Sequence, residues 1–296
     1  MSLELEHTTF LVNGIRMHTV IAGPEDGRPV FLLHGFPEFW RSWLKQIPPL
    51  AQAGFRLIVP DQRGYNLSET PKDVRAYSLD NLGQDVIGLM DHFGYCKIAL
   101  VRHDWGAAVA WYVALQHPDR ITRLGILNLP HPAVMLKFLR SSPRQLLKSW
   151  YVAFLQIPAL PDWLLGANNF AGAVALLRQS SKTSTFSDED IAAYRQAWTN
   201  SGGLTGMINW YRALVRYRPT LKPGLRLAMP VLILWGRQDI ALHYKMAEAS
   251  LKYCPQGQLI SLDNATHWVQ HDESDAVTQA LTGFLALEID SGDKED

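Results

Sequence analysis

Short apolar runs separated by helical stretches restrict the fold of this 296-residue chain more than any other feature. A short run that is apolar throughout is typical of a strand buried on both faces. Helical patterns lie between the runs, for example at residues 79–93 and 107–116. The runs are residues 29–33, 56–59, 97–101, 123–127 and 231–235. Strands that alternate with helices in this way predict an α/β fold, with a parallel sheet and right-handed crossovers.

Two regions depart from this alternation. Residues 9–12 and 15–22 flank Asn13-Gly14, which is a strong hairpin signal, so the chain is expected to open with two antiparallel strands. Residues 132–222 are rich in Trp, Leu and Tyr but have no convincing strand pattern, which favours an inserted helical cap. The expected organisation is therefore a core of residues 1–131 and 223–296 that is interrupted by this cap. The charged residues 290–296 are expected to form a frayed tail.

The composition favours a cytosolic protein with a substantial core. Hydrophobic residues make up 47% of the chain, and the 28 basic and 28 acidic residues cancel, so the total charge favours neither a nucleic acid nor an anionic membrane as a partner. Cys96 and Cys254 are far apart and have neither metal-ligand nor disulfide spacing, as expected in a reducing compartment. The N-terminal residues do not resemble a signal peptide, and no run reaches the ~18 apolar residues that a membrane span needs.

Asp104 lies where the strand at residues 97–101 turns sharply into the apolar helix that follows. A strand, a tight turn and a buried helix form a nucleophile elbow. A carboxylate at the elbow attacks saturated carbon and forms an alkyl ester, whereas a serine would form an acyl ester from a carbonyl substrate. Asp104 could instead only cap the helix, where a negative charge is favourable in any protein, but a cap does not explain the rest of the pattern.

Two later residues complete a triad in the expected order of nucleophile, acid and histidine. Asp239 follows the strand at residues 231–235, and His267 follows the apolar residues 258–262. An imidazole supported by Asp239 could take a proton from the water that attacks an Asp104 ester. Taken alone, Asp239 is more typical of a helix N-cap, and the joint order and spacing favour the triad. The other histidines considered are more typical of structural or solvated positions; they are His103, His131, His243 and His271.

A turn at residues 34–37 is expected to supply the oxyanion site. Backbone there must pass close to the elbow, so the amides of Phe36 and Trp105 are the candidate donors to the oxyanion. A plain Gly-Pro turn is the alternative interpretation. The peptide bond before Pro37 is a candidate for the cis form.

These motifs together resemble those of the α/β-hydrolase-fold epoxide hydrolases, nearly end to end. The matching segments are residues 34–38 (HGFPE), 61–68 (DQRGYNLS), 103–106 (HDWG) and 209–212 (NWYR). The resemblance implies a mostly parallel eight-stranded sheet with a helical cap, no metal or organic cofactor, and hydrolysis of an epoxide to a vicinal diol. The partners that it implies are a small apolar epoxide and water, and the chain could be a monomer or a homodimer.

The resemblance also implies two cap tyrosines that protonate the epoxide oxygen. Tyr211 matches within residues 209–212, and Tyr151 matches by its spacing to the end of its own helix. Opening a strained ether calls for an acid at its oxygen, and a phenol supplies one without adding a charge. Without the resemblance, packing of the cap would be the favoured role for both rings. The residues expected to line an apolar substrate site are Trp105, Trp150, Phe154, Leu155 and Trp210.

Two residues depart from the family pattern. Arg102 stands two positions before the nucleophile, where a small residue is usual, so we expect it to face solvent or a carboxylate, or else to distort the elbow. Asn66 stands where Gly is frequent, which is a mild change because Asn tolerates left-handed backbone.

Other functions remain open at this stage. Haloalkane and haloacid dehalogenases use the same Asp-His-acid chemistry. Haloalkane dehalogenases often carry Asn where this chain has Phe36, and fluoroacetate dehalogenases usually carry Arg where it has Trp105, so both positions favour the epoxide. A non-catalytic receptor on the same fold is a further alternative, encouraged only by Arg102, and turnover would distinguish it.

Overall fold

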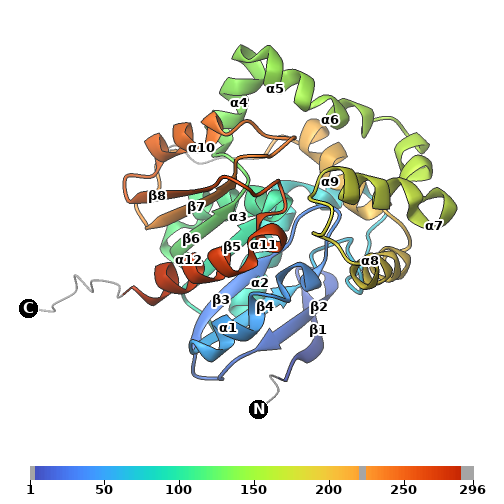
Figure 1. Cartoon of the computed structure of the whole chain (residues 1–296). Coiled ribbons are helices and arrows are strands. Elements are labelled where there is room, and N and C mark those ends of the chain that lie inside the picture. Colours follow the sequence, from blue (N-terminus) through green and yellow to red (C-terminus); the bar gives the residue numbers. More distant parts are fainter. Residues whose placement is uncertain (1–3, 220–224, 288–296) are drawn as a thin grey trace, which may run out of the picture.

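The computed structural model describes residues 4–219 and 225–287. An eight-stranded sheet runs through the molecule, with helices on both faces and a helical cap above one end (Figure 1). The predicted cap boundary at residue 222 and the predicted tail at residues 290–296 lie outside the described residues, so both stay predictions.

The strands have the order β1-β2-β4-β3-β5-β6-β7-β8. β2 is antiparallel to both of its neighbours, and the remaining pairs are parallel. The strands are β1 (Glu6–Val12), β2 (Ile15–Ala22), β3 (Arg28–Leu33), β4 (Phe55–Pro60), β5 (Ile98–His103), β6 (Ile121–Leu127), β7 (Val231–Gly236) and β8 (Gly257–Leu262). This topology confirms the predicted hairpin and the predicted α/β-hydrolase fold.

The central strands are largely apolar because helices cover both faces of the sheet. Successive side chains of β3 enter different cores: Phe31 and Leu33 pack with α2 and α3, whereas Val30 and Leu32 pack with α1 and α12. The core helices are α1 (Ile47–Gln52), α2 (Leu79–His92), α3 (Asp104–Gln116), α10 (Lys245–Ser250), α11 (Val269–Asp272) and α12 (Ser274–Ala286). Short 3₁₀ helices are η1 (Trp40–Trp43), η2 (Val74–Tyr77), η3 (Pro118–Arg120) and η4 (Leu251–Tyr253).

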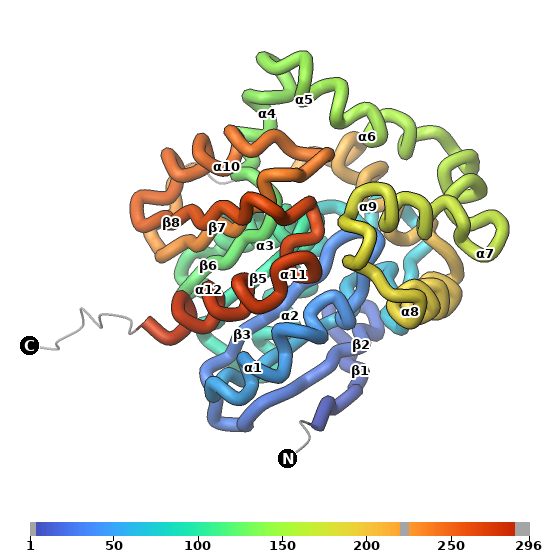
Figure 2. Tube along the Cα trace, in the orientation of Figure 1, coloured from blue at the N-terminus to red at the C-terminus, as the bar shows by residue number. Residues whose placement is uncertain are grey.

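The cap follows β6 and consists of helices, with no strand among the described residues 132–219. Pro132 and Pro143 begin the first two helices, a position where proline is favoured. The helices are α4 (Pro132–Ser141), α5 (Pro143–Lys148), α6 (Trp150–Phe154), α7 (Leu160–Gln179), α8 (Asp188–Asn200) and α9 (Thr205–Arg216). α7 is interrupted at residues 167–170, three of which have positive φ. Figure 2 shows the resulting arch from α4 to α7 along the outer edge of the molecule.

Buried hydrogen bonds join three cap helices to loops of the core. From α5, Lys148 Nζ donates to the carbonyl oxygen of Asp239 at 3.0 Å. From α8, Trp198 Nε1 donates to the carbonyl oxygen of Pro37 at 2.7 Å. From α9, Trp210 Nε1 donates to the carbonyl oxygen of Arg63 at 3.0 Å. The cap is therefore fixed to the core at several separate points.

Within the described part of the chain, none of the helices is both long enough and apolar enough to traverse a lipid bilayer.

Candidate active site

Asp104 is at the junction of β5 and α3, with a φ of 48°. This left-handed conformation is strained for a residue other than glycine, and it is characteristic of a nucleophile elbow. The close approach of the surrounding backbone requires small neighbours. A Cβ on Gly35 would lie 2.5 Å from the Cβ of Asp104, and one on Gly106 would lie 2.6 Å from the carbonyl oxygen of His34. The two glycines therefore permit the sharp turn.

Arg102 occupies neither of the two surroundings expected for it. Its side chain is 0% exposed, and its three guanidinium nitrogens have no hydrogen-bond partner among the described residues. The reason is the strand alternation: Arg102 is on the same face of β5 as Leu100, and α2 and α3 cover that face. Burial lowers the pKa of this guanidinium well below its ordinary value. The expected distortion of the elbow is also absent, because Asp104 remains within reach of His267.

His267 lies between the two carboxylates of the predicted triad. Its Nε2 is 3.3 Å from Asp104 Oδ2, and its Nδ1 is 2.8 Å from Asp239 Oδ2. All three groups are at the carboxyl ends of strands, Asp104 after β5, Asp239 after β7 and His267 after β8. The arrangement places one imidazole between a nucleophile and a supporting acid, as the chain order predicted.

Asp239 is held in place by the loop that carries it and by Asn128. Its Oδ1 accepts hydrogen bonds from the amides of Ala241 and Leu242, at 2.7 and 2.9 Å. Its Oδ2 accepts one from Asn128 Nδ2 at 2.7 Å, in addition to the contact with His267. Asp239 is therefore a partner of the histidine that also accepts bonds from its own loop. The helix N-cap interpretation is wrong, because residues 240–244 are not helical and α10 begins at Lys245.

The charges of the triad support one another. Burial alone would lower the pKa of His267, but the negative charges of Asp239 and Asp104 outweigh burial and raise the pKa well above its ordinary value of 6.5. Burial would raise the pKa of Asp104, but the hydrogen bond and charge of His267 hold that pKa below its ordinary value. The resting site at neutral pH is therefore an imidazolium between two carboxylates.

The backbone amide of Phe36 donates to Asp104 Oδ1 at 2.9 Å. This contact leaves Oδ2 as the oxygen that faces His267. The peptide bond between Phe36 and Pro37 is cis, as suggested for this turn. Trp105 is the first residue after the nucleophile, and the hydrogen bonds of the described residues include none from its amide to Asp104. Its predicted part in the oxyanion site stays a prediction.

Comparison with known proteins agrees with this geometry. The family model described as the alpha/beta hydrolase fold matches residues 28–274. Human epoxide hydrolase 4 is 37% identical over 283 residues, which cover 93% of this chain and 77% of that protein. The chain belongs to the epoxide hydrolases of the α/β-hydrolase fold. It is an enzyme of the hydrolase class.

Two bacterial proteins extend the comparison. The AB hydrolase superfamily protein YfhM of Bacillus subtilis (strain 168) is 42% identical to this hydrolase over 273 residues, 92% of this chain and 95% of that protein. The crystal structure of the Bacillus megaterium epoxide hydrolase with an inhibitor superimposes with a TM-score of 0.86 at 31% identity. That match covers 94% of this chain and 99% of the other. The likeness therefore extends over both the core and the cap.

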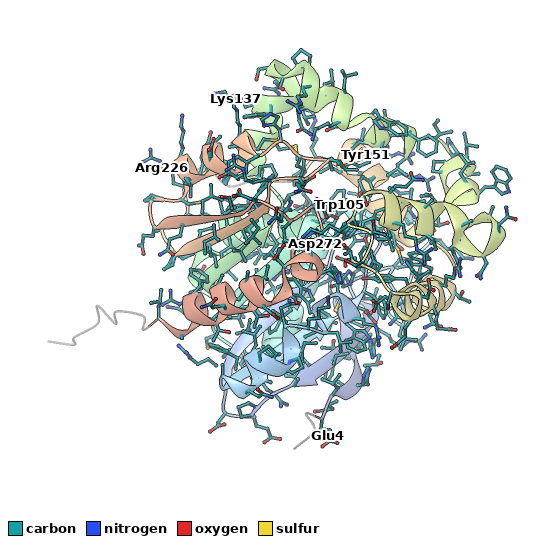
Figure 3. The ribbon with its side chains drawn as sticks, in the orientation of Figure 1. Glu4, Trp105, Lys137, Tyr151, Arg226 and Asp272 are labelled. Carbon is teal, nitrogen blue, oxygen red and sulfur yellow. The ribbon has the colours of Figure 1, made fainter. Side chains whose placement is uncertain are left out.

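Tyr151 and Tyr211 of this hydrolase face each other across the cap, with ring centroids 5.9 Å apart. Tyr211 also packs edge-on against Trp105 and Phe36, with centroid distances of 4.8 and 5.3 Å. Figure 3 shows Tyr151 on the cap side and Trp105 on the core side. Burial and the charge of Asp104 both raise the pKa of each tyrosine above its ordinary value, so both phenols stay protonated near neutral pH. The two hydroxyls are thus hydrogen-bond donors in the field of the nucleophile.

The predicted substrate-lining residues differ in their surroundings. Trp105 and Leu155 are buried and Phe154 is partly buried, which is compatible with an apolar site. Trp210 is also buried and packs edge-on against Trp105. Trp150 does not fit its predicted role, because 65% of its side chain is exposed. Consecutive residues of a helix point ~100° apart, so the inward position of Tyr151 turns Trp150 outward.

A buried carboxylate network that the sequence interpretation missed lies behind His267. His103 Nε2 faces the carbonyl oxygen of His267 at 2.8 Å, and its Nδ1 faces Glu38 Oε2 at 3.0 Å. Tyr194 of the cap donates to Glu38 Oε1 at 3.0 Å, and His271 Nε2 is 2.7 Å from the same oxygen. Hydrogen bonds from His103 and His271 outweigh the effect of burial and lower the pKa of Glu38. The network fixes the backbone of the catalytic candidate His267.

Asn128 was missed as well, although its position carried a signal. It follows β6 directly, at the sheet edge where Asp104, Asp239 and His267 also lie. A polar residue at the end of a buried parallel strand is therefore a candidate for a supporting role. For metals, the described residues hold no group of three or more His, Cys, Asp or Glu side chains that could bind an ion.

Proposed function

We propose that this hydrolase converts an apolar epoxide and water into a vicinal diol through an alkyl ester on Asp104. The observation that carries the proposal is the position of two phenols beside the nucleophile. Tyr211 packs against Phe36 and Trp105, and Tyr151 packs against Tyr211. An epoxide needs a proton donor at its oxygen while a nucleophile attacks its carbon. A halide needs no proton, so two phenols favour the epoxide over an alkyl halide. The catalytic set is Asp104, His267, Asp239, Tyr151 and Tyr211.

In the first step, Asp104 Oδ2 attacks one ring carbon and the bond from that carbon to the epoxide oxygen breaks. A phenol donates its proton to the departing oxygen, which becomes a hydroxyl group, and the phenolate regains a proton from solvent. Asp104 Oδ1 keeps the hydrogen bond from the Phe36 amide and becomes the carbonyl oxygen of the ester. The aromatic and aliphatic side chains of Trp105, Phe154 and Leu155 suit an apolar epoxide.

Once Asp104 is esterified, the imidazolium of His267 releases its resting proton to solvent. In the second step, the neutral His267 takes a proton from water, and the hydroxide attacks the carbonyl carbon of the ester. The charge that develops on Oδ1 is stabilised by the Phe36 amide, with the Trp105 amide as the second proposed donor. The tetrahedral intermediate collapses, the bond from the carbonyl carbon to the alkyl oxygen breaks, and the imidazolium returns its proton to the diol. The carboxylic acid left on Asp104 then passes its proton to His267, which restores the carboxylate and the resting imidazolium. Asp239 supports the imidazolium throughout.

The intact mass of a His267→Gln variant tests this proposal. After brief exposure to a mixed panel of aryl and alkyl epoxides, the variant should gain the mass of one whole epoxide, because ester hydrolysis stalls without the base. Asp104→Asn is the matched control and should gain none. Haloalkanes should be tested in parallel, since an adduct formed only with loss of halide would assign the site to a dehalogenase. No adduct from either panel, in folded protein, would favour the receptor alternative.

The two steps should also differ in their pH dependence. Asp104 has a pKa below its ordinary value of 3.8, so ester formation should change little between about pH 6 and pH 9. Ester formation neutralises Asp104 and removes one of the charges that raise the pKa of His267. The pKa of His267 should therefore fall in the ester, and hydrolysis should accelerate as the pH rises through that lower value. Rapid-quench single turnovers at a series of pH values measure both rates.

A loss of ester formation below neutral pH would contradict this assignment, because it would place deprotonation of His267 in the first step.

The cytosol remains the compartment that we propose. The two cysteines, Cys96 and Cys254, are both free thiols, which suits a reducing compartment.

A further inference from the structure

Large apolar side chains are exposed along the outer edge of the cap, on the arch formed by α4 to α7. The extreme cases are Leu147 on α5, with 74% of its side chain exposed, and Trp163 on α7, with 66% exposed. We call this surface the crest. Its exposed apolar residues are Leu136, Leu146, Leu147, Trp150, Ile157, Leu160, Trp163 and Leu164. A run of this size on one edge of a soluble protein marks an interaction surface rather than scattered surface residues.

The crest also carries a local positive charge that the balanced total conceals. Residues 132–161 contain four Lys or Arg residues and no Asp or Glu. Lys137, Arg140 and Arg144 are exposed, and none of the three has a carboxylate partner among the described residues. Figure 3 shows Lys137 at the outer side of α4. Exposed Leu and Trp side chains can enter an apolar layer, and unpaired cations can pair with negative groups that cover such a layer. The crest is therefore complementary to an apolar layer with an anionic surface.

A second copy of this chain is a poor binding partner for the crest. In a two-fold dimer the same patch meets itself, so Lys137, Arg140 and Arg144 of one copy would face their counterparts. Like charges brought together in an interface oppose association. The arch of helices α4 to α7 that carries the crest also bulges outward from the molecule (Figure 2). Shape and charge therefore both favour a deformable anionic surface.

We propose that the crest docks on the surface of a lipid bilayer that contains anionic lipid. Leu147, Trp163 and their apolar neighbours enter the boundary between headgroups and acyl chains, where tryptophan is favoured. Lys137, Arg140 and Arg144 pair with the negative headgroups. The protein stays peripheral, which agrees with the lack of a spanning helix in the described residues. Docking of this kind places the cap against the phase in which apolar small molecules concentrate.

Co-sedimentation with vesicles tests the proposal, with vesicles of phosphatidylcholine alone or mixed with phosphatidylglycerol. We expect binding only to the mixed vesicles. Raising the salt from about 0.1 M to about 0.5 M shortens the Debye length from about 10 Å to about 4 Å and should release most of the protein. Leu147→Glu and Trp163→Glu should each weaken the partition coefficient about tenfold, because each removes an apolar anchor and adds a repelled charge. Arg140→Gln combined with Arg144→Gln should weaken it about thirtyfold.

Leu11→Glu is the matched control. Leu11 is 75% exposed on β1, which lies at the bottom of Figure 1, away from the arch of α4 to α7 at the top. This change therefore adds the same charge away from the crest and should leave binding intact. Circular dichroism and thermal unfolding establish that each variant is folded. The assay measures binding alone and does not depend on the proposed reaction.

Three outcomes would overturn the proposal. The first is a folded wild-type protein that does not bind mixed vesicles, and the second is equal binding to both kinds of vesicle. The third is a crest variant that binds as well as Leu11→Glu. Light scattering after size exclusion should give the same molar mass for the wild-type protein and for Leu147→Glu. A wild-type dimer that Leu147→Glu dissociates would instead assign the crest to a second copy of the chain.

Discussion

Removing both phenolic hydroxyls, by Tyr151→Phe combined with Tyr211→Phe, is expected to slow formation of the Asp104 ester by about 10³- to 10⁴-fold. A positioned general acid contributes about 10²- to 10⁴-fold to a rate, and the double variant leaves the epoxide oxygen with no acid. In each single variant, the rate of ester formation should fall only about tenfold to a hundredfold, because one phenol still donates a proton to the epoxide oxygen. The two rings pack edge-on with their centroids 5.9 Å apart, and we propose that both hydroxyls serve the same epoxide oxygen.

Rapid quenching followed by intact mass measurement separates the two steps. Ester hydrolysis should be unchanged in the double variant, since water, His267 and the Phe36 amide perform that step. Tyr253→Phe is a suitable control, because Tyr253 stacks on His131 and takes no part in the proposed site. Equal slowing of both steps would instead indicate that the two tyrosines hold the cap in place and do not act as acids.

Replacing Arg102 by methionine is expected to stabilise the fold by about 3 kcal/mol, or about 150-fold in the unfolding equilibrium. The guanidinium is 0% exposed and has no hydrogen-bond or carboxylate partner among the described residues. An uncompensated buried charge costs several kcal/mol, and methionine fills similar space without a charge. Arg102→Lys retains a charge and should bring no such gain. Urea titration at fixed protein concentration measures the free energy of unfolding of the wild-type protein, Arg102→Met and Arg102→Lys.

A lower stability in Arg102→Met would contradict this prediction and would show that the guanidinium has partners in solution, such as buried water. Activity gives a separate readout. Because Asp104 already has the elbow conformation and lies within reach of His267, the stabilised variant should keep its rate of ester formation.

The strands of the core were predictable because burial on both faces leaves a strong local pattern. Residues 98–101, for example, are apolar and lead into the turn at Asp104, and the structure has β5 at Ile98–His103. The triad order was predictable for a related reason. The carboxyl ends of parallel strands meet at one edge of the sheet, so residues far apart in sequence converge there.

The remaining features depend on contacts that no local pattern carries. The surroundings of Arg102 depend on which helices cover one face of β5. The outward direction of Trp150 follows from the inward direction of Tyr151. The two are neighbouring aromatic residues, so the sequence pattern does not indicate which of them points inward. Glu38 acquires its role from His103, His271 and Tyr194, which come from three distant parts of the chain.

The bonds from α5, α8 and α9 to the core loops mean that this cap is not an exchangeable module. Lys148 holds the loop of Asp239, Trp198 holds the turn that presents Phe36, and Trp210 holds the loop of Arg63. A cap grafted from a relative without these three side chains would therefore leave the Asp239 loop, the turn of Phe36 and the Arg63 loop without their anchors. A chimaera that keeps its chemistry must carry these three loops together with the cap, as a single inherited unit.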